Sequence, residues 1–238
     1  MNHFLKSQLS RYGNNASIVK YVCIVLLASS VLTSCSTYRI NRLKNKSYKE
    51  WKAYQWNEMK RSTDKQGAEW IIHSRKVEGT NLLEYKIEGE IASTPEACVA
   101  AFWQHIHHQA DDINKYPTYD IMDESDSSFL TYVIHNEPFP FKDTEMSVRY
   151  LFSNYKECDR EVRWNEAWDE NSVPPSKKLN RVETFRGSWN FSAVSENHIK
   201  AVNIVQFDPK KMPKWLVNPM VTKFLKKGFE NIEQTTSK

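Results

Sequence analysis

The sequence of 238 residues is poor in glycine, with six in all, and contains four cysteines. Loops that cradle nucleotide phosphates need clustered glycines, and neither the G-x-x-x-x-G-K-[ST] nor the G-x-G-x-x-G pattern occurs. The G-x-S-x-G elbow of serine hydrolases, the H-E-x-x-H helix of zinc proteases and the C-x-x-C pair are also missing. These absences exclude the nucleotide-binding, hydrolytic and metal sites that such short motifs reveal.

Histidine and acidic residues gather in one segment, which contains His105, His107, His108, Asp111 and Asp112. On a helix His105 and His108 would share a face, and a metal site is one interpretation of that spacing. The other is a solvated helix end, where cationic histidine suits the helix dipole. No complete ligand set can be named, so we expect neither a metal nor another cofactor.

The N-terminal segment predicts export. Three basic residues precede an apolar run at residues 21–32, which is too short to span a bilayer comfortably and has the layout of a signal peptide. The run ends in Leu32, Thr33, Ser34 and Cys35, which resemble the cleavage box of bacterial lipoproteins. That resemblance implies that residues 1–34 are removed and that the Cys35 thiol is acylated, with palmitate as a typical chain.

After this cysteine the chain is basic and polar, which predicts a tether at residues 35–47 before one domain at residues 48–238. Ser36 is not Asp, and by the usual bacterial sorting rule this implies a lipoprotein of the outer membrane that faces the periplasm. An uncleaved anchor or ordinary secretion is the alternative interpretation.

The basic character of the chain belongs mainly to the signal. The formal net charge is +4, and residues 1–34 hold three lysines and arginines but no acidic residue. The remainder is therefore almost neutral, whereas nucleic-acid-binding domains carry a persistent basic excess. We do not expect nucleic acid to be a partner.

Two cysteines of the predicted domain, Cys98 and Cys158, are able to pair in an oxidising compartment. The sequence does not fix the distance between them, so a disulfide is left open. The oligomeric state is left open as well.

Hydrophobic periodicity predicts a helix, two strands, a second helix, six strands and a long final helix. The predicted helices are residues 48–59, 95–107 and 213–232. The predicted strands are residues 69–77, 82–91, 119–123, 129–135, 144–154, 161–170, 181–195 and 199–207. Short turns join the later strands, so we expect an antiparallel meander. The order is that of an α+β fold in which a curved sheet grips its last helix.

The last helix carries a long apolar stripe. Steps of 100° per residue place on it Val217, Met220, Val221, Phe224, Leu225, Gly228 and Ile232. Pro219 allows two starts, because Asn218 caps the helix or a helix from Pro213 is kinked. Gly228 lowers helix propensity by about 1 kcal/mol relative to alanine, which indicates a close approach or a weak point.

Three strings stand out in this order of elements: N-E-P-F-P-F-K-D at residues 136–143, R-G-S-W at 186–189 and F-D-P-K-K-M-P-K-W-L-V-N at 207–218. Together with the order of elements they resemble the START lipid-transfer domain of the helix-grip superfamily. Lys142 departs from the arginine that is common there in the family. The resemblance covers residues 48–232 and implies a deep apolar cavity between the curved antiparallel sheet and the C-terminal helix.

That cavity implies binding or transfer of a lipid or another hydrophobic molecule by a membrane-anchored protein, without covalent chemistry. The 8 Trp, 11 Tyr and 11 Phe residues agree, because they supply wide apolar walls. Two alternatives stay open. Helix-grip cavities also host cyclases and hydrolases, which would use Glu166 or a cavity histidine as acid or base. The third interpretation is a non-catalytic envelope-assembly protein.

Glu166 is the polar residue of most interest. A period of two along residues 161–170 places it on one face with Trp164 and Trp168. A carboxylate among apolar neighbours needs a cation, and Arg149 and Arg186 are the candidates. The alternative is that Glu166 lies at a strand end or faces water. We predict a cavity lined by Arg149, Tyr150, Trp164, Glu166, Trp168, Arg186, Trp189 and Phe224.

Overall fold

The computed structural model describes residues 46, 49–50, 52–63, 69–137, 142–156, 159–171, 173–208 and 214–236. The chain forms two compact units, Met1–Lys52 and Ala53–Lys238. In the first unit the described residues are helical, and Lys46 Nζ lies 3.9 Å from Glu50 Oε1. The predicted signal and Cys35 lie outside the described residues. Within the described part of the chain, no helix combines the length and the apolar character that a membrane span needs.

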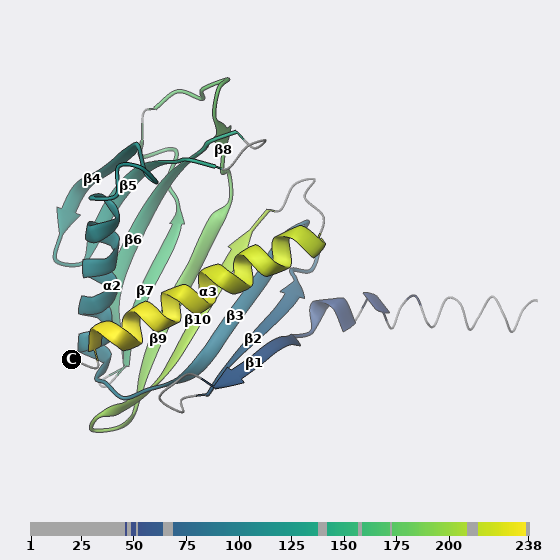
Figure 1. The fold of residues 1–238 in the computed structure, drawn as a ribbon, viewed down its shortest axis with the longest axis vertical. Coiled ribbons are helices and arrows are strands. Elements are labelled where there is room, and N and C mark those ends of the chain that lie inside the picture. The colour runs from purple at the N-terminus through teal and green to yellow at the C-terminus, as the bar shows by residue number, and fades with distance from the viewer. Residues whose placement is uncertain are drawn as a thin grey trace, which may run out of the picture. The chain divides into compact units, whose positions relative to one another are not determined.

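The described strands of the second unit form one large curved sheet (Figure 1). Their order across it is β1-β2-β3-β10-β9-β7-β6-β5-β4, with antiparallel neighbours, and the short β8 pairs parallel to β6. The strands are β1 Asn57–Thr63, β2 Glu69–Lys76, β3 Leu83–Ile91, β4 Thr118–Ser125, β5 Ser128–His135, β6 Thr144–Lys156, β7 Asp159–Glu166, β8 Asn180–Arg181, β9 Phe185–Ser195 and β10 His198–Phe207.

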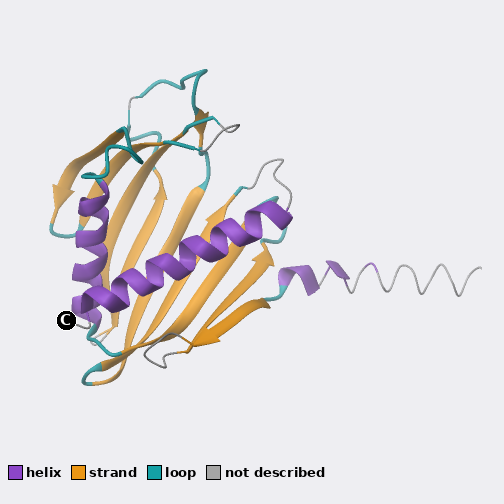
Figure 2. Cartoon of the chain, in the orientation of Figure 1, coloured by secondary structure: helices purple, strands orange, loops and turns teal. Residues whose placement is uncertain are grey.

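Two helices cover one face of this sheet, which we call the inner face, and the opposite one is the outer face (Figure 2). Helix α2, Pro95–Gln109, is capped by Thr94, whose side-chain oxygen accepts a hydrogen bond from Ala97 N at 3.3 Å. Pro95 occupies the first turn, where its missing N–H is not needed. Helix α3, Lys214–Thr236, runs diagonally across the strands.

Alternation along the strands builds the inner face. In β10, Ile199, Ala201, Asn203 and Val205 are buried, and the residues between them are more exposed. Their cross-strand partners continue the same face, as Trp189 of β9 does opposite Asn203. Every second residue therefore joins one core, as the period of two predicts. The predicted α+β architecture, a curved antiparallel sheet that grips a long C-terminal helix, is confirmed.

Helix α3 is held by a buried stripe of Val217, Leu225, Phe229 and Ile232. Full burial of each such side chain stabilises the fold by roughly 1.5–3 kcal/mol relative to exposure. Phe229 approaches the sheet over Gly89, where an added Cβ would lie 2.8 Å from its Cζ. The absence of a side chain in β3 therefore lets the helix lie close to the strands.

Pro219 lies inside α3, because the described helix begins at Lys214 and not at the proline. Asn218 does not cap the helix. Its Oδ1 instead accepts a hydrogen bond of 2.7 Å from the hydroxyl of Tyr85 in β3. Burial raises the pKa of Tyr85 to about 12, so this hydroxyl keeps its proton and ties helix to sheet.

The predicted first helix, residues 48–59, is wrong at its C-terminal end. The chain is helical at Ala53 and Tyr54, but β1 begins at Asn57 and pairs with β2. Trp56 falls within the predicted helix, but it lies just before β1, and the Arg75 guanidinium carbon lies 4.3 Å from its ring centroid. Pairing with the edge of a large sheet outweighs the weak helical pattern of a polar segment.

Cys98 is a free thiol on the buried side of α2. Burial raises the pKa of its thiol to about 11, so it is protonated and unreactive at neutral pH. Cys158 lies outside the described residues.

Candidate functional site on the inner face

Aromatic side chains of the inner face pack against aromatic side chains of α2. Phe102 of α2 lies 6.4 Å from Trp164 in a stacked arrangement and 5.9 Å from Tyr150, measured between ring centroids. Trp103 meets Phe129 edge to face at 4.9 Å. Aromatic pairs at such distances add to the stability that area burial gives. Helix α2 is thus fixed on β5, β6 and β7 through rings.

A second group of rings lies under α3. Trp189 and Phe191 of β9 stack with centroids 5.4 Å apart, and Phe229 of α3 lies 6.4 Å from Trp189. A Cβ on Gly228 would lie 3.8 Å from the Trp189 ring, an ordinary van der Waals distance. The helix therefore meets β9 at its glycine without crowding.

Trp164 lies flat over Gly187 of β9. A Cβ at position 187 would clash with the carbonyl oxygen of Ile204 and lie 2.5 Å from Cζ2 of Trp164. Glycine is therefore required here by the close approach of an indole ring rather than by an unusual backbone angle. The string at residues 186–189 has a physical role, since it seats the ring that faces α2.

Few polar groups share this face. Nε1 of Trp164 is buried without a hydrogen bond, and the side chain is only 4% exposed. The hydroxyl of Tyr150 makes no hydrogen bond with any described residue. Asn203 donates to the carbonyl oxygen of Ser188 at 3.4 Å. Burial raises the pKa of Tyr150, so its hydroxyl is neutral.

Between the strand ends, the inner-face positions of the central strands carry no charge. These are Met146, Val148, Tyr150 and Phe152 in β6, Val162 and Trp164 in β7, Gly187, Trp189 and Phe191 in β9, and Ile199, Ala201, Asn203 and Val205 in β10. Such a surface suits a hydrophobic molecule that presents few polar atoms.

Three predicted site residues, Tyr150, Trp164 and Trp189, lie on this face as expected, and their contact with a ligand stays a prediction. Glu166 is paired with Arg186, one of its two candidate cations, and also accepts from Phe185 N at 3.4 Å. The pair lies at the end of β7, and the Arg186 side chain is 44% exposed. The interpretation of Glu166 as a strand-end residue therefore replaces that of a buried polar anchor.

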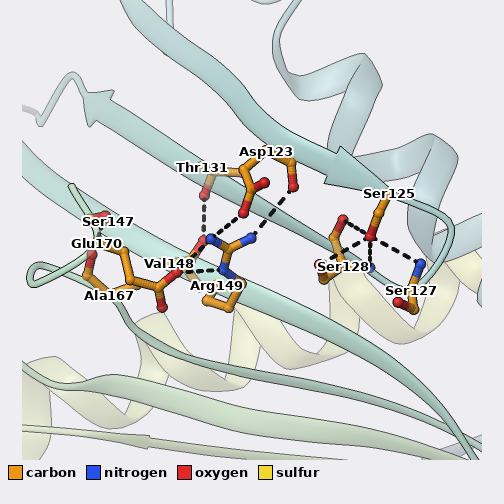
Figure 3. A network of polar contacts seen from close by, with 10 residues as sticks. All are labelled: Asp123, Ser125, Ser127, Ser128, Thr131, Ser147, Val148, Arg149, Ala167 and Glu170. Atoms are coloured by element: carbon orange, nitrogen blue, oxygen red, sulfur yellow. Dashed lines mark hydrogen bonds and ion pairs between the residues drawn. The ribbon is translucent and has the colours of Figure 1, made fainter.

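Arg149 lies on the outer face, which corrects the prediction. Its guanidinium binds Asp123 Oδ2 at 2.7 Å and Glu170 Oε2 at 2.5 Å (Figure 3). Neighbouring residues of a strand point to opposite faces, so Arg149 and Tyr150 cannot line one cavity. Asp123 has a positive φ of 47°, and its ion pair with Arg149 supports this irregular end of β4.

Trp168 also lies on the outer side, because β7 ends at Glu166 and the following turn breaks the period of two. Its Nε1 donates to Val182 O at 2.9 Å, and the Arg181 guanidinium lies 3.8 Å from its ring centroid. Arg181 Nε in turn binds the fully buried carboxylate of Glu145 at 2.9 Å. The buried ion pair of this region is thus Glu145–Arg181.

Phe224 is 56% exposed on the far side of α3, and Met220 is exposed beside it. The apolar stripe predicted for α3 was wrong in part, because it included these two exposed residues and omitted the buried Phe229. The large apolar residues of α3 spread over a wider part of the helix surface than the part that is buried. Periodicity alone therefore does not identify the buried ones.

The three clustered histidines point to different neighbours. His105 meets Asn231 of α3 at 3.4 Å, and His107 meets Glu124 at 2.9 Å. Among the described residues no set of three or more potential metal ligands is found. His105 lines an open groove of about 380 Å³ between α2 and α3, together with Lys227 and several amide side chains. Its pKa is lowered, first by burial and then by Lys227.

No family model matches the sequence, and no curated protein matches it either. Solved structures do match. A STAR-related lipid transfer protein from Xanthomonas axonopodis is 16% identical, with a TM-score of 0.60 over 77% of this chain and 99% of that one. The chain has the helix-grip fold of START domains. The human StarD13 lipid transfer domain is 12% identical, with a TM-score of 0.62 over 83% of this chain and 95% of that one. Human STARD10 is 16% identical, with a TM-score of 0.59 over 80% of this chain and 77% of that one.

The three strings of the START resemblance have roles in this START fold where they are described. Asp143 Oδ1, just before β6, accepts a hydrogen bond from Glu137 N at 3.0 Å. Gly187 makes room for Trp164, and Asn218 ties α3 to Tyr85. The strings therefore mark the points where α3 and the central strands are positioned.

Proposed function

We propose that this protein binds a lipid or another hydrophobic molecule between its sheet and α3, and carries it without covalent chemistry. The observation that carries the proposal is the inner face, where aromatic and aliphatic side chains of the central strands present no charge between the strand ends. The START fold supports it, since solved proteins of this fold are named as lipid transfer proteins.

Native mass spectrometry of the purified full chain, followed by solvent extraction, tests this proposal. We expect a non-covalent adduct of one hydrophobic molecule, which solvent removes and vesicles restore. A chain that stays free of any such molecule after incubation with vesicles, and that instead copurifies with a protein partner, would favour an envelope-assembly role.

The proposal excludes catalysis by Glu166. Its carboxylate, at the end of β7, is engaged by the Arg186 guanidinium and by Phe185 N. An acid or base of an enzyme must reach the substrate within hydrogen-bond distance. If the bound molecule is converted by the purified chain and Glu166→Gln abolishes the conversion, an enzyme of the cyclase or hydrolase kind replaces the carrier.

We further propose that Cys35 is acylated and anchors the chain to the outer membrane, facing the periplasm. The support is the cleavage box at residues 32–35 and Ser36 after it. Cys35→Ala should leave an unprocessed precursor and release any processed chain from membranes. Equal membrane association and identical processing in Cys35→Ala would contradict the anchor and leave the carrier proposal untouched.

A further inference from the structure

Two hydrogen-bonding groups of the inner face have no partner in the described protein. Nε1 of Trp164 is buried without an acceptor, and the Tyr150 hydroxyl makes no hydrogen bond with a described residue. The two residues are directly opposite each other on β7 and β6, with ring centroids 6.3 Å apart. The buried indole without an acceptor therefore lies directly beside a hydroxyl that no described residue binds.

The same residue types on the outer face are paired. Trp168 Nε1 donates to Val182 O at 2.9 Å, and the Tyr132 hydroxyl donates to Glu145 at 3.1 Å. A buried donor without an acceptor destabilises a fold, because its hydration is lost and nothing replaces it. Such a donor in a native structure needs an acceptor from outside the protein, which a ligand oxygen or a water molecule can supply.

The surroundings decide which partner fits. Phe102, Phe129 and Phe185 are the ring neighbours of the pair, and they offer no counter-charge. Glu166 and Arg186, at the end of β7, already neutralise each other. An ionised head group beside Trp164 would lose its hydration without gaining an opposite charge, whereas a neutral oxygen would gain a hydrogen bond.

We propose that Trp164 and Tyr150 together bind the oxygen of a neutral, otherwise apolar ligand, such as an alcohol, ketone or ester. The inference rests on the proposed function and adds the ligand class to it. The indole donates to the oxygen, and the tyrosine hydroxyl donates to it or accepts from it. Because neighbouring side chains cover the indole nitrogen, Phe102 of α2 must shift before a ligand reaches it.

Displacement of the neutral dye Nile red from the purified full chain tests the ligand class. Dodecane, 1-dodecanol and dodecanoate have alkyl chains of similar length but different ends. Dodecane has no hydrogen-bond acceptor, 1-dodecanol ends in a neutral hydroxyl, and dodecanoate ends in a charged carboxylate. We expect 1-dodecanol to displace the dye at the lowest free concentration. Equal potency, or a preference for dodecanoate, overturns the inference alone. If the dye and all three probes fail to bind, the proposed function fails with it.

Matched variants test the two residues. Tyr150→Phe and Trp164→Phe remove the unpaired groups, and Tyr132→Phe and Trp168→Phe remove paired groups of the outer face. Each inner-face variant should weaken the binding of 1-dodecanol about tenfold, or about 1.4 kcal/mol, and leave the affinity for dodecane unchanged. The outer variants should change neither.

A water molecule that satisfies the two groups predicts a different result, in which the ratio of 1-dodecanol to dodecane is the same in all four variants. That result overturns the proposal. If Trp164→Phe does not fold, because it leaves a space beside Gly187, Tyr150→Phe decides the matter, since it removes a single oxygen atom.

Discussion

The buried carboxylates of the outer face and the buried indole of Trp164 on the inner face differ in their hydrogen bonding. On the outer face the buried carboxylates have partners from the protein itself: Glu145 binds Arg181 and Tyr132, and Glu84 binds Arg75. On the inner face the indole of Trp164 has none. The buried carboxylates of the outer face are thus paired without a ligand, whereas the buried indole of Trp164 on the inner face has no hydrogen-bond partner among the described residues.

This difference suggests that the two faces of one strand have different roles, the outer face in stability and the inner face in ligand binding. Arg149 and Tyr150 are neighbours in β6, yet Arg149 ties β6 to Asp123 and Glu170 while Tyr150 faces the ring cluster. Changes on the outer face should therefore alter folding and leave binding intact. The predictions below test that separation, beginning with the largest expected effect.

Arg181→Met should destabilise the protein by about 3–5 kcal/mol, because it leaves the carboxylate of Glu145 buried without its cation. The matched control is Arg186→Met, which breaks the more exposed pair with Glu166 and should change stability by less than about 1 kcal/mol. Urea unfolding measures both. Similar losses in the two variants would mean that burial of Glu145 does not set the strength of its ion pair.

Substitution by alanine should change stability in opposite directions at Gly187 of β9 and at Gly228 of α3. Gly187→Ala should destabilise the fold by about 1–3 kcal/mol, since the new Cβ meets the Ile204 carbonyl and the Trp164 ring. Gly228→Ala should stabilise it by up to about 1 kcal/mol, because α3 gains helix propensity and the Cβ has room beside Trp189. Thermal unfolding checks both signs, and a destabilised Gly228→Ala would show that α3 lies closer to β9.

Helix α3 should open before the sheet does. Pro219 removes a backbone donor and Gly228 removes a side chain from the buried stripe, so local opening should need less free energy than global unfolding. In hydrogen exchange without ligand, amides of residues 221–229 should exchange faster than those of residues 144–152. Bound ligand should slow the helix selectively. Equal protection in both segments, with and without ligand, would contradict a movable helix.

The smallest effect concerns pH. Burial, then Lys227, Lys115 and His108, lowers the pKa of His105 in the folded protein. The unfolded chain therefore binds a proton near the ordinary value of about 6.5 while the folded chain does not, and stability should decrease as pH falls below that value. His105→Gln should reduce this decrease between pH 7 and pH 5 in urea unfolding. An unchanged slope would assign the dependence to other groups.

Local patterns in the sequence predict most of the fold. Thr94 and Pro95 mark the start of α2, and alternating apolar residues mark β10 within one residue of its ends. These signals are local, because caps and the period of two depend on neighbouring residues only. The order of elements follows from them.

The candidate site was predicted only in part, because faces depend on where elements end and how they are rotated. The end of β7 at Glu166 moves Trp168 to the outer side, and the rotation of α3 exposes Phe224 while burying Phe229. Neither is visible in an apolar pattern that is wider than its buried part.

The ion pair of Glu145 and Arg181 was missed for another reason. The two residues are 36 positions apart and meet because β8 pairs parallel to β6. No local spacing encodes such a pairing. An arginine at the first residue of one predicted strand and a glutamate inside another were the available signals, and many pairs in the sequence share them.

The central claim is that a hydrophobic ligand lies against the inner face and not the outer one. The most direct test is the indole ¹⁵N–¹H spectrum of the full chain during titration with 1-dodecanol, with signals assigned by Trp→Phe variants. The account predicts that the Trp164 signal moves as a hydrogen bond forms and that the Trp168 signal, already bonded to Val182, stays in place. Movement of Trp168 alone, or of neither signal while the ligand is bound, would contradict it.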